Sequence, residues 1–390
     1  MAAKKWTVID HATSTNLADL KITPATVGGS AKGYEVNKWT LHGGLSQGVD
    51  LIHVNNGTFT FDLIPTRGMS VWKAWLGKDE IGWRSPTRGP VHPAFVDMGE
   101  PSGLGWLDGF DELMVRCGLE SNGAPEHDPK TNQLIYPLHG RIGNKPAHHV
   151  EIEVNGDTGE ITVKGIVEET RFHFFKVRMT SVFKTKVGQP GFSIHDEIEN
   201  ISASPTEIQI LYHMNIGQPL LDAGTQFLAP IKTLVPRNDH AASGIKSWNS
   251  YTGEEAGFEE QVYFMELLGG ADGTTQTLLK NAHSTKGIST FYNVNQLKCY
   301  SIWKNTTSAA DGFVTGLEPA TNFPNPRTYE GKNGRVAKLA GGGKTRYDLR
   351  IEAHGNAASV NKAEAAIKKL QSQAKPKIFD KPQKGWCADA

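Results

Sequence analysis

Hydrophobic and polar positions alternate with a period of two along much of the chain, which is typical of half-buried β-strands. The alternation is clear over residues 175–180, 192–199 and 346–352. Two hairpins are predicted by turn sequences between β-rich segments, at Asn55–Gly57 and Asn155–Asp157. The pattern predicts an all-β protein in which antiparallel sheets form one large two-sheet unit.

Helical periodicity is rare in this sequence. Apolar residues fall on one stripe over residues 360–372, and Asn361 with Glu364 fits a capping box at the start of that helix. A second, short helix is predicted over residues 16–20. Residues 230–288 are interpreted as loop-rich. These features predict a few short helices and one C-terminal helix around the sheets.

Residues 82–124 form a long irregular segment rich in aromatic residues and glycine. Such segments are uncommon in compact domains and are often functional. Exposed aromatic rings also suit the apolar faces of sugars. The alternative interpretation is a packed connection whose aromatic side chains fill a core.

The chain has 390 residues, which we divide into three parts. Residues 1–45 are expected to be an N-terminal extension packed on the main domain. Residues 46–355 are expected to form the β-sandwich domain, and residues 356–390 a C-terminal helix and tail.

Composition limits the classes of partner. The formal net charge is zero and the basic residues do not cluster, which argues against nucleic acid as a partner. No segment approaches the roughly 20 apolar residues of a membrane span, and the N-terminus lacks the apolar region of a secretory signal. The three cysteines are widely spaced, which favours a reducing compartment. We therefore expect a cytoplasmic protein that does not bind membranes.

Three sites carry polar residues where a plain strand would not. In the first, His139 and Arg141 lie two residues apart and would share one face of an extended backbone. In the second, His213 and Asn215 share a face of the extended stretch 208–215. The third is Glu318, which lies at the end of an apolar strand. Two imidazoles, an arginine and a carboxylate make an acid–base set without a nucleophile or a phosphate loop.

Each site also has a structural interpretation. His139 and Arg141 would then be solvated at a strand end, His213 would be a structural histidine, and Glu318 would be an edge residue in water. A metal site is a further alternative for the histidines, but no HExxH or CxxC spacing exists and no metal is expected.

The order of three motifs resembles the galactose mutarotase (aldose 1-epimerase) superfamily. The motifs are Leu138–Gly140, Leu211–Asn215 and Gly316–Pro319. The chain is more closely similar to the bacterial branch of aldose-1-epimerase-like proteins of undefined substrate. That similarity spans roughly residues 45–353 and is carried by Pro65–Met69, Gly82–Trp83, Pro90–Ala94, Gly105–Leu107, Cys117–Leu119, Leu138–Asn144 and Glu260–Tyr263.

The resemblance implies a β-supersandwich with a sugar cleft on one face and a cofactor-free reaction. Glu318 would take the proton of the anomeric hydroxyl, and His213 would give a proton to the ring oxygen. The ring would open, rotate about C1–C2 and close on the other face. His139 and Arg141 would bind hydroxyls or polarise the ring oxygen. The remaining candidates for contacts with the monosaccharide are Arg67, Asn215 and Asp222.

Several alternatives remain open at this level. Arg141 stands where better-known members of the superfamily have glycine, and Arg141 with Arg67 would suit an acidic or phosphorylated sugar. An isomerase or lyase acting on an oxidised, acidic or phosphorylated sugar is therefore a second hypothesis. A non-catalytic carbohydrate-binding protein is a third. Asp222 is equally suited to capping a turn, and a homodimer is one candidate assembly.

Overall fold

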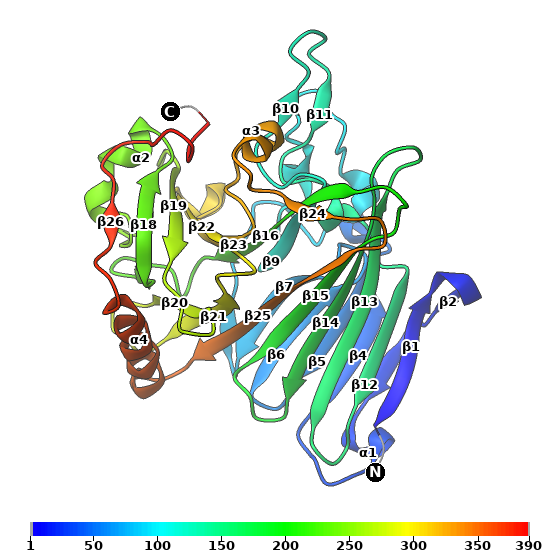
Figure 1. The fold of residues 1–390 in the computed structure, drawn as a ribbon. Coiled ribbons are helices and arrows are strands. Elements are labelled where there is room, and N and C mark those ends of the chain that lie inside the picture. Colours follow the sequence, from blue (N-terminus) through cyan, green and yellow to red (C-terminus); the bar gives the residue numbers. More distant parts are fainter. Residues whose placement is uncertain (1–2, 389–390) are drawn as a thin grey trace.

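The computed structural model describes residues 3–388, which fold into two large sheets (Figure 1). The all-β class, the antiparallel sheets and the C-terminal helix predicted from the sequence are confirmed.

The first sheet has ten strands among the described residues. In spatial order they are β17 (Gln226–Leu228), β20 (Thr274–Lys280), β21 (Gly287–Asn293), β25 (Lys344–His354), β15 (Gly191–Asn200), β14 (Lys176–Lys186), β13 (Glu160–Thr170), β12 (His149–Val154), β1 (Lys4–Asp10) and β2 (Thr15–Asn16).

The second sheet has fourteen strands within residues 3–388. Its main path is β26 (Lys377–Ile378), β18 (Ile231–Pro236), β19 (Gln261–Leu267), β22 (Cys299–Asn305), β23 (Val314–Ala320), β16 (Thr206–Ile216), β9 (Met114–Leu119), β7 (Ser70–Leu76), β6 (Phe59–Ile64), β5 (Asp50–Asn55), β4 (Glu35–Thr40) and β3 (Leu20–Ile22). Two short strands pair beside this path, β8 (Asp79–Ile81) with β7 and β24 (Ala337–Leu339) with β16.

The remaining elements are short. A two-stranded ribbon of β10 (Glu126–His127) and β11 (Leu134–Tyr136) projects at the top of Figure 1. The α-helices of the described part are α1 (Pro24–Val27), α2 (Asp239–Ser243), α3 (Arg327–Lys332) and α4 (Ala357–Gln371). No helix in residues 3–388 combines the length and the apolar character that a bilayer crossing requires.

The two sheets pack face to face over one apolar core. Residues of β13, β14 and β15 alternate between buried and partly exposed, so one face of each strand lies on the core. Phe61 of β6 stacks on Phe192 of β15 across the sheets, with ring centroids 4.6 Å apart. Strands β16 and β23 differ, because nearly all their residues are buried on both faces. A second layer of side chains must therefore cover the outer face of these two strands.

A fully buried ion pair joins the sheets near this point. Arg116 of β9 donates from Nε to Asp196 of β15 at 2.5 Å, and both side chains are excluded from solvent. Tyr212 of β16 donates its hydroxyl to the same carboxylate at 2.8 Å. Ser181 of β14 accepts from Arg116 at 2.7 Å. Charges removed from water this completely need such partners.

One helix prediction is wrong, and the confirmed C-terminal helix differs from its prediction in its start and its cap. Residues 16–20 are not helical, because Asn16 of β2 pairs with Ile9 of β1 and Leu20 begins β3. The C-terminal helix begins at Ala357, three residues before the predicted start, and Asn356 caps it by accepting from the Ser359 amide. Asn361 lies inside this helix, so the capping box expected there does not form.

The segments expected to be peripheral or irregular contribute strands. Residues 230–288 contain β18, β19 and β20, so strands occupy about a third of the segment that was interpreted as loop-rich. Within residues 3–45, β1 pairs with β12 in the first sheet and β4 pairs with β5 in the second. The division of the chain at residues 45 and 355 stays a prediction.

Replacing Asp196 by alanine should lower the free energy of unfolding by about 3–5 kcal/mol, because Arg116 would keep its charge in the core without a countercharge. Urea denaturation of wild type and variant measures this difference. Glu197→Ala, one residue along β15 in a half-exposed pair with Lys344, is the matched control and should change stability far less. Equal losses in the two variants would contradict the role given to the buried pair.

Candidate active site

The register of β16 and β23 places a histidine opposite a glutamate. Leu211 pairs with Ala320 and Met214 pairs with Leu317, so His213 lies across from Glu318. Nε2 of His213 is 3.2 Å from Oε1 of Glu318, and each side chain is less than 5% exposed. Both side chains lie on the outer face of the strands, whereas Leu317 and Met214 pack in the inter-sheet core.

Asn215 determines which nitrogen of His213 carries the proton. Its Nδ2 donates to the backbone carbonyls of Glu112 and His213, at 2.9 and 3.2 Å. Because carbonyls only accept, the amide oxygen of Asn215 must be the atom that faces Nδ1 of His213, at 2.7 Å. Nδ1 is therefore the donor in the neutral ring, and Nε2 presents its lone pair to Glu318. Asn215 contacts His213 rather than the cavity, contrary to the expectation that it binds substrate.

Burial governs the protonation of the pair. Desolvation raises the pKa of Glu318 to about 8, Glu260 adds to this effect, and Arg237 opposes it. Desolvation lowers the pKa of His213 well below its usual 6.5. At neutral pH the proton of the pair therefore lies on Glu318, which donates to Nε2 of His213.

Gly316 provides the space for this pair. A Cβ at position 316 would lie 2.5 Å from Oε1 of Glu318 and 3.1 Å from Cε1 of His213. Gly316 and Glu318 point to the same face of β23 because they are two residues apart. The glycine of the Gly316–Pro319 motif therefore has a steric role at the site.

His139 reaches the same space from a turn. The prediction of an extended strand is wrong at this point, because the backbone is left-handed at His139 and Gly140, with φ of +56° and +69°. Nδ1 of His139 donates to the Asn122 carbonyl at 3.0 Å, which leaves Nε2 without a proton in the neutral ring. The His139 and His213 rings meet edge to face, with centroids 5.1 Å apart. Burial lowers the pKa of His139 to about 4.

A cavity of about 280 Å³ opens onto these three side chains. Trp106 and Phe110, from the irregular segment 82–124, pack over the outer face of β16 and beside the His213 ring, and both are buried. This is the covering layer that β16 and β23 require. The cavity is lined by Leu104, Trp106, Leu107, Phe110, Ala124, Leu138, His139, His213, Arg237, Glu260, Val262, Trp303, Glu318 and Pro324.

The sequence reasoning missed a charged pair in the cavity wall. Glu260 accepts from Nε1 of Trp303 at 2.6 Å and from Nη2 of Arg237 at 3.0 Å, and all three side chains are half-buried. Arg237 follows β18, Glu260 precedes β19 and Trp303 lies in β22. Glu260 stood in one of the stretches similar to the superfamily, but no pattern in the sequence singled out Arg237.

Arg67 does not reach the cavity, contrary to expectation. It is 1% exposed and pairs with Glu112 through Nε at 2.6 Å. Its other nitrogens donate to Val91, Asn144 and Gly109. These contacts use the guanidinium to join separate loops, so Arg67 is structural.

Arg141 and Asp222 also lie outside the cavity lining. The turn at His139 and Gly140 ends the extended backbone, so Arg141 does not share a face with His139. Arg141 instead lies 3.6 Å from Glu120 in a partly exposed pair. The carboxylate of Asp222 accepts from the Ala223 amide at 2.7 Å, which is the turn-capping alternative considered for it.

Volume alone does not select the site. Another hollow, of about 400 Å³, is lined by Cys299, Arg335, Arg346 and Trp386 among others, but by no histidine. Across residues 3–388, no group of three or more His, Cys, Asp and Glu side chains is arranged to hold a metal ion. The smaller cavity is distinguished by its chemistry, which combines a protonated carboxyl with two imidazole acceptors.

Replacing Glu318 by glutamine should stabilise the protein increasingly as pH rises. Between 4.5, the pKa of an exposed glutamate, and about 8, the folded state of wild type holds a proton that the unfolded state has lost. The stability of wild type therefore falls as pH rises through this window. The glutamine variant does not titrate at this position, so it does not lose that stability. Thermal unfolding at pH 5 and pH 8.5 measures the difference, with Glu197→Gln controlling for loss of a surface carboxylate. A difference in Tm that does not grow with pH would contradict the raised pKa.

Comparison with known proteins shows the family and the fold of this chain. Residues 46–353 match the family described as a domain of unknown function, DUF4432. A solved structure described as a putative aldose 1-epimerase from Klebsiella pneumoniae is 34% identical, with a TM-score of 0.94 over 98% of this chain and 99% of that chain.

More distant structures share the fold. A galactose mutarotase-like protein from Clostridium acetobutylicum is 13% identical, with a TM-score of 0.57 over 82% of this chain and 98% of its own. A galactose 1-epimerase from Lactobacillus acidophilus is 10% identical, with a TM-score of 0.54 over 83% and 99%. The comparison with curated proteins found no match. The chain therefore belongs to the DUF4432 family and, with it, to the galactose mutarotase (aldose 1-epimerase) superfamily.

Proposed function

We propose that the protein interconverts the anomers of an uncharged monosaccharide by opening and closing the sugar ring. The observation that carries the proposal is the buried pair of His213 and Glu318, which holds one transferable proton. Ring opening needs a base for the anomeric hydroxyl and an acid for the ring oxygen. Both oxygens are attached to C1, so an acid and a base 3.2 Å apart can serve them together.

The protonation of the pair sets the direction of transfer. In ring opening, Glu318 gives its proton to the ring oxygen while Nε2 of His213 takes the proton of the anomeric hydroxyl. After rotation about C1–C2, Glu318 takes the proton from the C5 hydroxyl or its equivalent, and His213 returns its proton to the carbonyl oxygen. The pair ends as it began. In this scheme Glu318 acts on the ring oxygen and His213 on the anomeric oxygen in both steps, which exchanges the two oxygens relative to the roles implied by the resemblance.

His139 and the aromatic residues are suited to holding the sugar. The unprotonated Nε2 of His139 can accept a hydrogen bond from a hydroxyl. Trp106, Phe110 and Trp303 line the cavity and suit the apolar C–H faces of a sugar ring. A volume of about 280 Å³ lies at the small end of ligand sites, which favours a monosaccharide.

The charge of the cavity favours an uncharged ligand. Arg67 and Arg141, which suggested an acidic or phosphorylated sugar, do not line it. Arg237 is the one arginine or lysine in the lining, and Glu260 accompanies it at 3.0 Å. An anionic sugar would also meet Glu260 itself.

Purified wild type should accelerate anomer exchange of at least one neutral hexose or pentose, measured by saturation-transfer NMR. Glu318→Gln and His213→Ala should each lower kcat by roughly 10²–10⁴-fold, because each removes one partner of the proton transfer. Glu197→Gln is the matched control and should retain activity. Sugar binding without any accelerated exchange would instead identify a carbohydrate-binding protein, and activity on acidic sugars alone would contradict the charge argument.

The pH dependence tests which residue carries the proton. With the proton on Glu318, kcat/KM should hold steady through pH 6.5 and fall as pH rises through about 8, where the pair loses it. The exchange rate measured with Glu318→Gln is subtracted from the wild-type rate at each pH, which removes the uncatalysed exchange in buffer. A fall centred near pH 6.5 would contradict this assignment, because it would require a protonated histidine of ordinary pKa.

A further inference from the structure

We propose that the C-terminal segment, residues 385–388, positions His139 in the cavity through two intervening loops, residues 322–325 and 122–124. The segment lies beyond residues 46–353, which match the family. Its effect would reach the site through packed backbone and amide contacts rather than through contact with the sugar.

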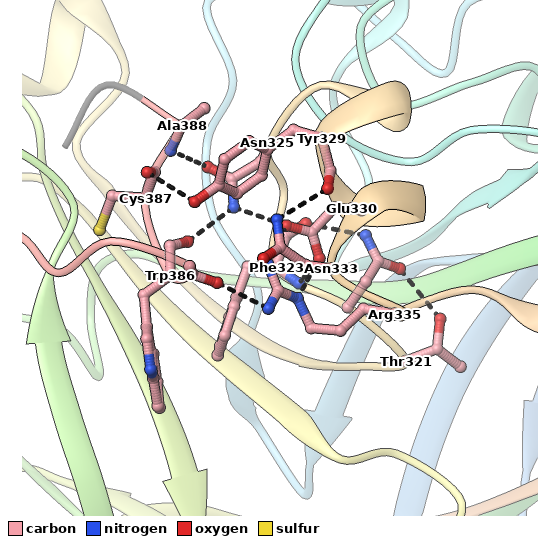
Figure 2. Close-up of polar contacts among 12 residues, drawn as sticks. Thr321, Phe323, Asn325, Tyr329, Glu330, Asn333, Arg335, Trp386, Cys387 and Ala388 are labelled. Carbon is pink, nitrogen blue, oxygen red and sulfur yellow. Dashed lines mark hydrogen bonds and ion pairs between the residues drawn. The ribbon is translucent and has the colours of Figure 1, made fainter.

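The first step joins the C-terminal segment to the loop after β23 (Figure 2). Asn325 donates from Nδ2 to the Trp386 carbonyl at 2.8 Å, and its Oδ1 accepts from the Ala388 amide at 3.1 Å. The Trp386 ring stacks on Phe323 with centroids 4.8 Å apart, and Phe264 of β19 stacks on Phe323 at 4.7 Å. The loop is therefore held on both its polar and its apolar side.

A buried ion pair reinforces this step. Glu330 of α3 is fully buried and accepts from Nδ2 of Asn325 at 2.7 Å and from the Phe323 amide at 3.2 Å. Arg335 donates from Nη2 to Glu330 at 2.6 Å and from Nη1 to the Gly385 carbonyl at 2.7 Å. The carboxylate of Glu330 thus holds the loop, and the guanidinium of Arg335 joins that carboxylate to the C-terminal segment (Figure 2).

The second step joins this loop to the loop after β9. The buried amides of Asn122 and Asn322 donate to each other, at 2.8 and 2.7 Å. The Ala124 amide donates to the Pro324 carbonyl at 3.1 Å. A Cβ at Gly123 would lie 2.0 Å from the Asn325 carbonyl oxygen, so the two backbones are in direct contact.

The third step reaches His139. Its backbone amide donates to the Gly123 carbonyl at 2.9 Å, and its Nδ1 donates to the Asn122 carbonyl at 3.0 Å. These bonds fix both the left-handed turn and the tautomer that leaves Nε2 free. Ala124 and Pro324 themselves line the cavity. A displacement of either loop would move a cavity wall and the carbonyl that orients His139.

Two variants interrupt the chain of contacts at different points. Asn325→Leu removes the bonds to Trp386, Ala388 and Glu330, and Asn322→Leu removes the amide pair with Asn122 while leaving the C-terminal segment in place. Asn333→Leu is the matched control, because Asn333 lies in the same region but its amide donates to the Tyr329 carbonyl. Circular dichroism and thermal unfolding report whether each variant folds.

The primary readout is long-range ¹⁵N–¹H NMR of the imidazoles in the full chain, with the His139 signals assigned by comparison with His139→Gln. Wild type and Asn333→Leu should show one tautomer, protonated at Nδ1. Folded Asn325→Leu and Asn322→Leu should show a mixture of tautomers and a His139 pKa that rises from about 4 toward 6.5. Unchanged His139 signals in folded Asn325→Leu would overturn the inference. If Asn325→Leu does not fold, Trp386→Ala, which removes the ring stacked on Phe323, decides it.

Kinetics supply a second readout, which rests on the proposed function. Both variants should raise KM for the active sugar severalfold with a smaller change in kcat, because the reacting pair of His213 and Glu318 is left in place. A loss confined to kcat would overturn the positioning role. If wild type accelerates no exchange, the proposed function fails, and the NMR of His139 still decides the inference.

Discussion

Exclusion of water from Glu318 and His213 is the constraint on which the site depends. In water the two groups would hold their ordinary pKa values, and at neutral pH the carboxyl would be ionised. Burial reverses this by raising one pKa and lowering the other, so the proton stays on the carboxyl. The surrounding structure serves this exclusion. Gly316 leaves room for the pair, and Trp106 with Phe110 covers it.

The scaffold explains how two such groups can be buried together. Strands β16 and β23 lie inside the second sheet, with the inter-sheet core on one face and the cavity on the other. Their backbone hydrogen bonds fix the register, so the separation of His213 and Glu318 does not depend on flexible loops. Loops instead supply His139 and the charged pair of Arg237 and Glu260. The site therefore combines a rigid acid–base pair with a binding wall whose geometry depends on loop packing.

Much of the fold could be predicted from alternation and turn residues. The hairpins at Asn55–Gly57 and Asn155–Asp157 and the strand containing His213 are present as expected. Errors arose where local sequence competed with distant partners. A helix was predicted over residues 16–20, but Asn16 pairs with β1 and Leu20 pairs with β4, so the ends of this stretch belong to strands. No local signal could reveal those partners.

The sequence by itself determined the all-β class and most strand faces, and it placed His139, His213 and Glu318 among the candidates that the structure brings to one cavity. Only the tertiary structure decided which other candidates join them. Arg141 was selected by assuming an extended backbone, which the left-handed turn at His139 interrupts. Arg67 was selected as a ligand contact at a strand end, but its guanidinium is buried against Glu112 and backbone carbonyls. Protonation was equally undetermined, because a pKa depends on the water and charge around a group rather than on its neighbours in sequence. Segments far apart in the chain come together only in the packed fold. The periodicity of apolar residues and the spacing of motifs along the sequence carry no information about which segments meet.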